Sequence, residues 1–272
     1  MVRRIFKFAS VLIVVFIGLI LSMVTNVLIL KIFPENYELF GTIISTIGTI
    51  IVCLLGLFIA SKIDDKNLKE YGIIWHASDS IKLLIGLVIG VTIFVLSTFP
   101  LYITHIYILN NGNHDIWILI TGFVSFVATG VIEELVFRGF LFHRLSNFNP
   151  MIALIVSSTL FSLLHSTNPG ITSLGLINLF LFGLFLALMI YIFKSIAISI
   201  GIHITWNWAQ GSLLGIPVSG TLSNGFFNTN IITNHSVLIT GGDFGAESSI
   251  FITILLIILC LILIVFSFKM NQ

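Results

Sequence analysis

Charged residues are scarce in this sequence. Of its 272 residues, 12 are Lys or Arg and 11 are Asp or Glu, together 8%, whereas a soluble globular protein averages about 25%. Because 57% of the residues are hydrophobic, the chain is not built to fold in water. The net charge is +1 and the longest basic run is Arg3-Arg4. The sequence therefore offers no basic surface for a nucleic acid, and we expect no nucleic-acid partner.

Cysteines are also few. Cys53 and Cys260 both lie within long apolar runs. Two such residues are too few for a disulfide framework or a zinc cluster. We interpret both as small core residues.

The few charges delimit long uncharged segments. A membrane-spanning helix needs about 20 apolar residues. Uncharged runs of 23, 23 and 32 residues are bounded by Lys7 and Lys31, by Glu38 and Lys62, and by Lys82 and Asp115. Each of these runs predicts one span.

The second half of the chain adds further spans. The 49 uncharged residues between Arg144 and Lys194 are divided by the polar stretch 165–170, which contains Pro169. This division gives the segments 150–165 and 174–193, and further helices fit 116–142, 195–210 and 250–268. The sequence therefore predicts an all-α, polytopic membrane helix bundle with about eight transmembrane helices.

The basic residues predict an orientation. Short cytoplasmic loops collect Lys and Arg. If the amino terminus is cytoplasmic, ten of the eleven basic residues in loops lie on the cytoplasmic side and only Lys31 lies outside. We therefore expect both termini to be cytoplasmic, in the cell membrane if the source is bacterial. Segment 211–249, with seven glycines and no Lys or Arg, would lie on the opposite side as a connector.

Two acidic residues lie where an apolar span should have none. Glu133 and Glu134 are adjacent within the predicted helix 116–142, and the other nine acidic residues lie in loops or at span ends. Ionisable groups at this depth cost at least about 2.5–3.5 kcal/mol each and usually serve function. Arg138 shares a helical face with Glu134, which permits an ion pair. Glu133 is turned by about 100° from Glu134, so a packing salt bridge would not explain it.

Two histidines also lie inside predicted spans. His165 follows Phe161 by four residues, and His203 precedes Asn207 by four, so His203 and Asn207 share a helical face. A lone intramembrane histidine is more often a hydrogen-bonded packing residue. Two of them, together with a diacidic helix, favour a functional site.

These polar residues lie at similar depths. A helix rises 1.5 Å per residue, so the distance from the predicted cytoplasmic helix end is roughly 16 Å for Glu133 and 22 Å for His165. It is roughly 13 Å for His203 and 19 Å for Asn207. A carboxylate and a neutral imidazole can take a proton from water, and a second His with an Asn can donate hydrogen bonds to an oxyanion. The pattern is typical of hydrolytic chemistry.

Three motifs carry a resemblance. Glu-Glu-x-x-x-Arg, Phe-x-x-x-His and His-x-x-x-Asn, in this order between Val131 and Asn207, resemble the motifs of the CAAX prenyl protease and bacteriocin-processing family, also called Abi or CPBP, of intramembrane proteases. Each motif alone is weak, but the three together at this spacing are specific. The resemblance implies a catalytic membrane core over 111–272, preceded by amino-terminal transmembrane helices over 1–110.

The resemblance also implies roles for the motif residues. Glu133 and His165 would activate a water molecule, and His203 and Asn207 would stabilise the oxyanion. Glu134 and Arg138 would bind substrate or orient the site. The expected function is that of an intramembrane endopeptidase acting on a membrane-associated peptide or a bacteriocin-like precursor. Its expected partners are that peptide or protein substrate and the lipid bilayer.

Zinc is the alternative to a metal-free site. Members of the family are often labelled metalloproteases, and one Glu with two His could ligate zinc. However, the sequence has no His-Glu-x-x-His motif, and a Glu/His pair can activate water by itself. We therefore expect no cofactor.

Two other classes of function stay open. A non-catalytic membrane scaffold or a bacteriocin self-immunity protein could keep this fold, with the polar residues holding helices together. A transporter could use the intramembrane charges as a proton relay. The sequence shows neither an inverted repeat nor a second acidic span, which disfavours transport.

Overall fold

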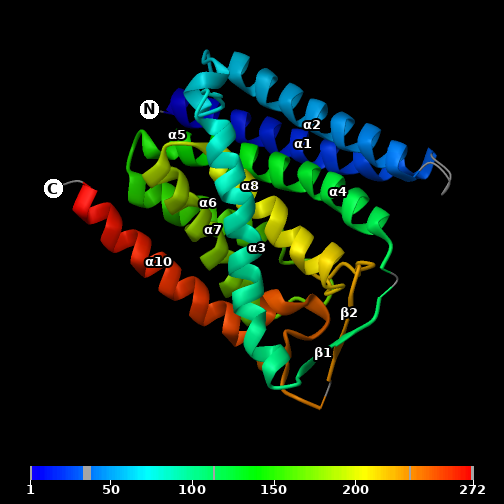
Figure 1. Cartoon of the computed structure of the whole chain (residues 1–272). Coiled ribbons are helices and arrows are strands. Elements are labelled where there is room, and N and C mark those ends of the chain that lie inside the picture. Colours follow the sequence, from blue (N-terminus) through cyan, green and yellow to red (C-terminus); the bar gives the residue numbers. More distant parts are fainter. Residues whose placement is uncertain (1, 33–37, 113, 233, 271–272) are drawn as a thin grey trace.

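A computed structural model describes residues 2–32, 38–112, 114–232 and 234–270 of the chain, and the side chains of residues 9–269 within these ranges. Most of this part is helical (Figure 1). The long helices are α1 (Val2–Ile32), α2 (Glu38–Ile63), α3 (Asp79–Ile103), α4 (Ile116–Glu134), α6 (Pro150–Leu164), α7 (Ser173–Phe193), α8 (Ile196–Trp208) and α10 (Ile250–Met270).

Shorter elements connect the long helices. They are the 3-10 turns Leu68–Tyr71, Gly242–Phe244 and Ala246–Ser248, the π-helical segments Leu135–Phe142 and Ala209–Leu213, the single turns α5 (His143–Ser146) and α9 (Val237–Thr240), and the strands β1 (Tyr107–Asn110) and β2 (Asn228–Ile231).

Six helices in the described part of the chain are long and apolar enough to cross a membrane. They are α1, α2, α3, α4 with its continuation to Ser146, α7 and α10. The predicted all-α polytopic membrane bundle is confirmed. The predicted count of about eight spans is not, because α6 and α8 have only 15 and 13 residues, fewer than the roughly 20 that a span needs.

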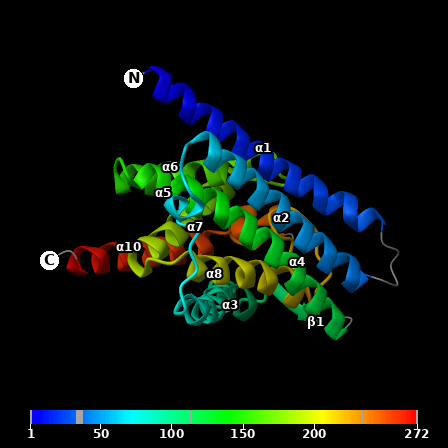
Figure 2. The same cartoon turned by 90° about the horizontal axis from the view of Figure 1, so that it is seen from above.

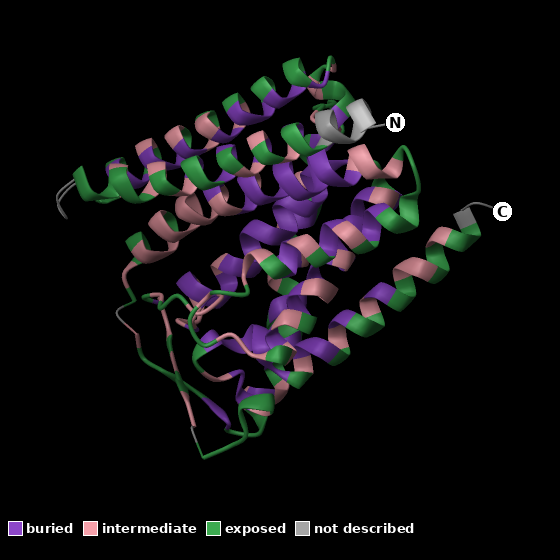
Figure 3. Ribbon diagram, turned by 180° about the vertical axis from the view of Figure 1, so that it is seen from behind, coloured by how far each residue is buried: buried purple, intermediate pink, exposed green. Residues whose placement is uncertain are grey.

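Outer and inner helices differ in what they bury. On the outer helices α1, α2 and α10, large apolar side chains such as Ile13, Phe58 and Leu261 are exposed, as expected of helices that face lipid. In α8, every residue from Ile196 to Asn207 is buried. Figure 3 shows the buried residues concentrated in the middle of the bundle, which places the polar side chains of α8, such as His203 and Asn207, away from lipid.

Glycines bring α3 and α8 into backbone contact. A Cβ atom added to Gly86 or Gly90 of α3 would lie 2.3 Å from the carbonyl oxygen of Ile198 or Ile202, respectively. Small residues four apart allow this close approach between membrane helices. Thr205 of α8 also donates a hydrogen bond of 2.7 Å to the Leu87 carbonyl. The position of α8 is therefore fixed by its contact with α3.

Polar caps fix where the inner helices begin. An oxygen of the preceding side chain accepts hydrogen bonds from the first backbone N–H groups of α6, α7 and α8, and thus satisfies donors that a helix cannot satisfy itself. The capping residues are Asn149, Thr172 and Ser195. Pro150 follows Asn149 as the first residue of α6, a position at which its missing N–H costs nothing.

The segment predicted as a connector, 211–249, folds over one end of the bundle. β2 pairs antiparallel with β1, with Tyr107 opposite Ile231. In Figures 1 and 2 the start of α1 and the end of α10 lie at the other end of the bundle from the strands. Which end faces the cytoplasm stays a prediction, as does the division at residues 110 and 111. The side chains of Arg3, Arg4 and Lys7, which entered the charge count, lie outside the described residues.

Candidate active site

Helix α4 ends with the two acidic residues. Glu133 and Glu134 are its last two residues and are 3% and 0% exposed. The chain then continues as the π-helical segment Leu135–Phe142. Such segments are rare and occur frequently at functional sites.

One carboxylate oxygen of Glu134 contacts both a guanidinium and an imidazole. Its Oε1 lies 3.0 Å from Arg138 Nη1 and 3.1 Å from His203 Nδ1. Arg138 Nη2 also donates to the Gly183 carbonyl at 3.2 Å, and its guanidinium lies 4.3 Å from the centre of the Phe161 ring. Glu134 thus links the first motif to the third, and Arg138 links it to the second.

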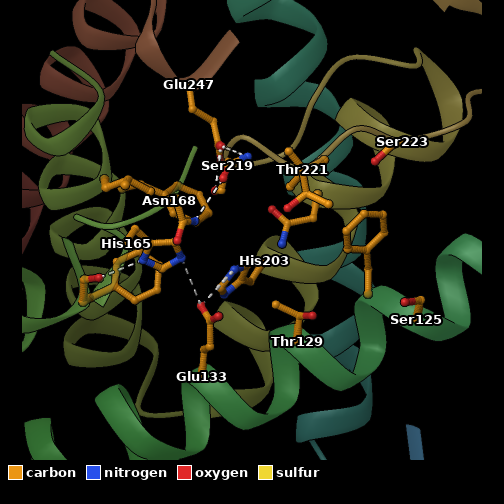
Figure 4. A pocket seen from close by; sticks show the side chains of 16 residues that line it. Ser125, Thr129, Glu133, His165, Asn168, His203, Ser219, Thr221, Ser223 and Glu247 are labelled. Atoms are coloured by element: carbon orange, nitrogen blue, oxygen red, sulfur yellow. Dashed lines mark hydrogen bonds and ion pairs between the residues drawn. The ribbon is translucent and has the colours of Figure 1, made fainter. Parts of the chain in front are cut away.

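Glu133 faces the other way. Its Oε2 lies 3.8 Å from His203 Nε2 and 4.0 Å from His165 Nε2 (Figure 4). This buried oxygen has no hydrogen-bond partner among the described residues. Both distances are too long for a direct hydrogen bond, but a water molecule can bridge groups at this separation.

The tautomer of His165 follows from its local contact. His165 comes directly after the last residue of α6, and its Nδ1 lies 2.9 Å from the Phe161 carbonyl oxygen. A carbonyl oxygen only accepts, so Nδ1 carries the hydrogen. In the neutral ring Nε2 is then an acceptor. The lone pair that can take a proton therefore faces Glu133.

His203 is oriented by Glu134 in the same way. The Glu134 carboxylate accepts from Nδ1, which assigns the hydrogen to this nitrogen. Nε2 of His203 can therefore donate a hydrogen bond only when the ring is protonated.

One cavity collects the candidate catalytic residues. It has a volume of about 350 Å³ and is lined by Glu133, His165, His203 and Asn207, the four residues predicted to be catalytic. Phe161 also lines it, whereas Glu134 and Arg138 do not. The structure thus brings all four predicted catalytic residues together and places the two predicted orienting residues behind them.

Loop residues that the sequence analysis missed complete the cavity wall. Figure 4 shows Asn168 beside His165, and Ser219, Thr221, Ser223 and Glu247 from the segment predicted as a connector. Glu247 lies three residues before an apolar run, where a solvated carboxylate at the membrane surface is the ordinary interpretation. No signal in the sequence places it on the cavity.

Glu247 differs from an ordinary surface carboxylate. It is 5% exposed, and burial raises the pKa of its carboxyl above the usual value, while hydrogen bonds from Ser219 and the nearby His165 act in the opposite direction. The cavity thus holds two buried carboxylates, Glu133 and Glu247, with His165 and His203 between them (Figure 4).

Glu133 lies farther from the two histidines than zinc ligands lie from one another. Among the described residues, no group of three or more His, Cys, Asp or Glu side chains is placed to hold a metal ion. A tetrahedral zinc with ligands at 2.0–2.1 Å would draw those ligand atoms to within about 3.4 Å of each other, closer than the 3.8 and 4.0 Å from Glu133 to the two histidines. That the protein works without a cofactor stays a prediction.

Comparison with known proteins gives a family match over part of the chain. Residues 115–209 match the type II CAAX prenyl endopeptidase Rce1-like family. The match covers α4, α6, α7 and α8 and includes all three motifs, so the predicted resemblance is confirmed over this segment. The search of curated proteins gave no match, and neither did the search of solved structures.

Proposed function

We propose that this protein is an intramembrane endopeptidase that hydrolyses peptide bonds with water activated by Glu133 and His165. The observation that carries the proposal is the buried Oε2 of Glu133, which lacks a hydrogen-bond partner among the described residues and faces two imidazole Nε2 atoms across a cavity. A protease family match over the same residues supports it.

The first step is addition of water. A water molecule within hydrogen-bond distance of Glu133 Oε2 and His165 Nε2 attacks the carbonyl carbon of the scissile peptide bond. Its proton passes to this Glu/His pair, and the carbonyl oxygen becomes an oxyanion. General-base assistance of this kind contributes typically about 10²–10⁴-fold to the rate.

The second step breaks the carbon–nitrogen bond. Asn207 donates a hydrogen bond to the oxyanion, and His203 donates a second one from Nε2 when both of its ring nitrogens carry hydrogen, which stabilises charge that is absent in the substrate. The proton held by the Glu/His pair then passes to the departing amine. The products are a carboxylate and an amine, and the pair is ready for another water molecule.

The environment of Glu133 favours catalysis over a scaffolding role. In a packing role, polar groups in a helix bundle pair with one another, as Glu134 does with Arg138. Glu133 Oε2 instead lies 3.8 and 4.0 Å from two imidazole nitrogens without a hydrogen bond among the described residues, and a buried polar atom without a hydrogen bond is costly. A catalytic group keeps this arrangement because its partner is the reacting molecule.

The substrate is proposed to be a membrane-associated peptide or a bacteriocin-like precursor. The cavity lining combines the aromatic rings of Phe126, Phe161 and Phe182 with the hydroxyl groups of Ser125 and Thr129. Such a lining suits an apolar peptide whose backbone also needs hydrogen bonds.

The test uses purified protein in liposomes. Peptides that accumulate in cells lacking the gene are identified by mass spectrometry and synthesised as internally quenched substrates, with and without an isoprenyl group on any cysteine. The wild type should release fluorescence and Glu133→Gln should not, while Glu70→Gln, at an exposed glutamate, should match the wild type. Cleavage by Glu133→Gln at the wild-type rate would disprove the mechanism.

A further inference from the structure

Glu247 lies outside the segment that matches the family, yet it reaches the cavity. It is on the 3-10 turn Ala246–Ser248, next to the start of α10. Its carboxylate is buried and lines the cavity together with Glu133 and His165. The hydrolytic steps proposed above leave this group without a role.

The Glu247 carboxylate binds one residue twice. Its Oε2 accepts hydrogen bonds of 2.8 Å from both the backbone N–H and the hydroxyl of Ser219. Ser219 has a φ of +47°, in the left-handed region that residues other than glycine rarely adopt. The two bonds hold Ser219 in this conformation at the edge of the cavity.

Ser219 in turn holds the turn that follows His165. Its carbonyl oxygen accepts a hydrogen bond of 3.0 Å from the Asn168 side chain, and the Asn168 backbone N–H donates to the His165 carbonyl at 3.1 Å. His165 lies just beyond α6, so this turn, rather than a following helical turn, fixes its position. A continuous chain of hydrogen bonds therefore runs from Glu247 to His165, and Figure 4 shows its side-chain links from Glu247 through Ser219 to Asn168.

The far end of this chain is firmly anchored. Asn178 of α7 donates hydrogen bonds of 2.7 and 2.9 Å to the carbonyl oxygens of Glu247 and Ser249. The side-chain oxygen of Asn178 accepts a bond of 2.7 Å from Thr253 of α10. Two membrane-spanning helices thus fix the backbone of Glu247, and a fixed support is what holding a catalytic group in place requires.

We propose that Glu247 is a positioning residue of the peptidase: through Ser219 and Asn168 it holds the 165–168 turn, and so sets the distance between His165 and Glu133. The proposal rests on the function proposed above. It makes the segment 211–249 part of the catalytic machinery, because the support for His165 lies within it.

Loss of the support should lower kcat and leave KM nearly unchanged. In Glu247→Ala, Ser219 and the 165–168 turn lose their anchor, and a displacement of about 1 Å in such a site can cost about 10²-fold in rate. Glu247→Gln should regain most of the activity, because its amide oxygen can accept both bonds from Ser219. Asp243→Asn, at an exposed acid of the preceding turn, is the matched control and should behave as the wild type.

A double variant shows whether the residues act as one chain. Asn168→Ala removes a different link of the same chain, the hydrogen bond to the Ser219 carbonyl, and leaves the Glu247 carboxylate with its two bonds from Ser219. It should therefore give the same loss of kcat. If both residues act only through His165, Glu247→Ala/Asn168→Ala should be no slower than the slower single variant. Losses that multiply in the double variant would overturn the proposal.

Hydrogen exchange measures the opening of the 165–172 turn without an activity assay. Amide exchange in residues 165–172 should be faster in Glu247→Ala, and unchanged in Asp243→Asn, because a turn without its anchor opens more often. If Glu247→Ala fails to fold, the same exchange and kcat effects must be found in Asn168→Ala.

Failure of this inference is separable from failure of the proposed function. If Glu133→Gln is inactive while Glu247→Ala or Asn168→Ala keeps its kcat per folded molecule, the inference is wrong and the peptidase stands. If Glu133→Gln is fully active, the peptidase mechanism is wrong. If the wild type cleaves none of the peptides, unchanged exchange in residues 165–172 still overturns the positioning of His165 by Glu247.

Discussion

Glu133 and Glu134 are neighbours in the sequence, but their environments are opposite. Oε1 of Glu134 lies 3.0 Å from Arg138 Nη1 and 3.1 Å from His203 Nδ1, whereas Oε2 of Glu133 comes no closer than 3.8 Å to an imidazole nitrogen. A rotation of about 100° along an α-helix separates the two side chains, so one serves packing and orientation while the other faces the cavity. Their contributions to stability should therefore differ as well.

The two glutamine variants should separate stability from activity. Glu134→Gln leaves Arg138 as a buried cation without its anionic partner, which typically costs about 3–5 kcal/mol. Glu133→Gln removes a buried charge whose Oε2 has no hydrogen bond among the described residues, and should leave the melting temperature equal to the wild type or higher. Thermal unfolding of both variants in one detergent measures the difference. A larger loss of stability in Glu133→Gln would contradict the assignment.

The oxyanion donors should matter for turnover but not for metal content. His203→Ala and Asn207→Ala each remove one donor and should lower kcat by about 10²–10³-fold. Elemental analysis of the purified wild type should find no stoichiometric zinc, and phenanthroline should not inhibit it. Zinc that disappears together with activity in His203→Ala would instead establish a metalloprotease.

The sequence alone predicts the positions of some site residues and not of others. The spacing of Glu133, Glu134 and Arg138 predicts which carboxylate pairs, because helix geometry fixes the neighbours at i and i+4. Glu247 and Ser219 could not be placed this way. They lie in a glycine-rich segment without periodicity, and only the folded chain brings them to His165.

At the level of elements, the proposed catalytic side chains His203 and Asn207 depend on α8 and on what packs against it. Gly86 and Gly90 allow the backbone of α3 to contact the backbone of α8. This contact fixes the position of α8 and therefore the positions of His203 and Asn207. Uncharged runs predict the long helices well, because a charge inside lipid is costly. They wrongly predict membrane spans at 150–165 and 195–210, because a helix buried inside the bundle has the same apolar composition as a helix in contact with lipid.

A methyl group on α3 should therefore disturb the site from a distance. In Gly90→Ala the added Cβ would lie 2.2 Å from the Thr205 hydroxyl and 2.3 Å from the Ile202 carbonyl, and overpacking of this kind typically costs about 1–3 kcal/mol. We expect lower thermal stability and a lower kcat. Gly48→Ala is the control, because its Cβ meets only side-chain ends of Ile29 and Thr25. Equal effects of both variants would contradict the role of the α3–α8 contact.

For the whole molecule, the orientation in the membrane decides which compartment the segment 211–249 faces. The basic residues of the loops predict that this segment is outside the cytoplasm. The start of α1 and the end of α10 lie at one end of the bundle, away from the strands (Figures 1 and 2). Because the loops of this segment form part of the cavity wall, the orientation also bears on where the substrate is met.

Cysteine labelling tests the orientation. Cys53 and Cys260 are buried, so they should contribute little background. Leu222→Cys, at a side chain that is 86% exposed, should react with an impermeant maleimide in intact cells. Lys69→Cys, on the predicted cytoplasmic side, should react only after lysis. The reverse pattern would invert the topology.

The decisive measurement is a double-variant cycle on Glu133 and His165. With the quenched peptide in liposomes, Glu133→Gln and His165→Ala should each lower kcat by at least about 10²-fold, and the double variant should be scarcely slower than either, because residues that activate one water molecule act as a unit. The result that would contradict shared water activation is a double variant whose loss equals the product of the two single losses, or a Glu133→Gln protein that turns over like the wild type.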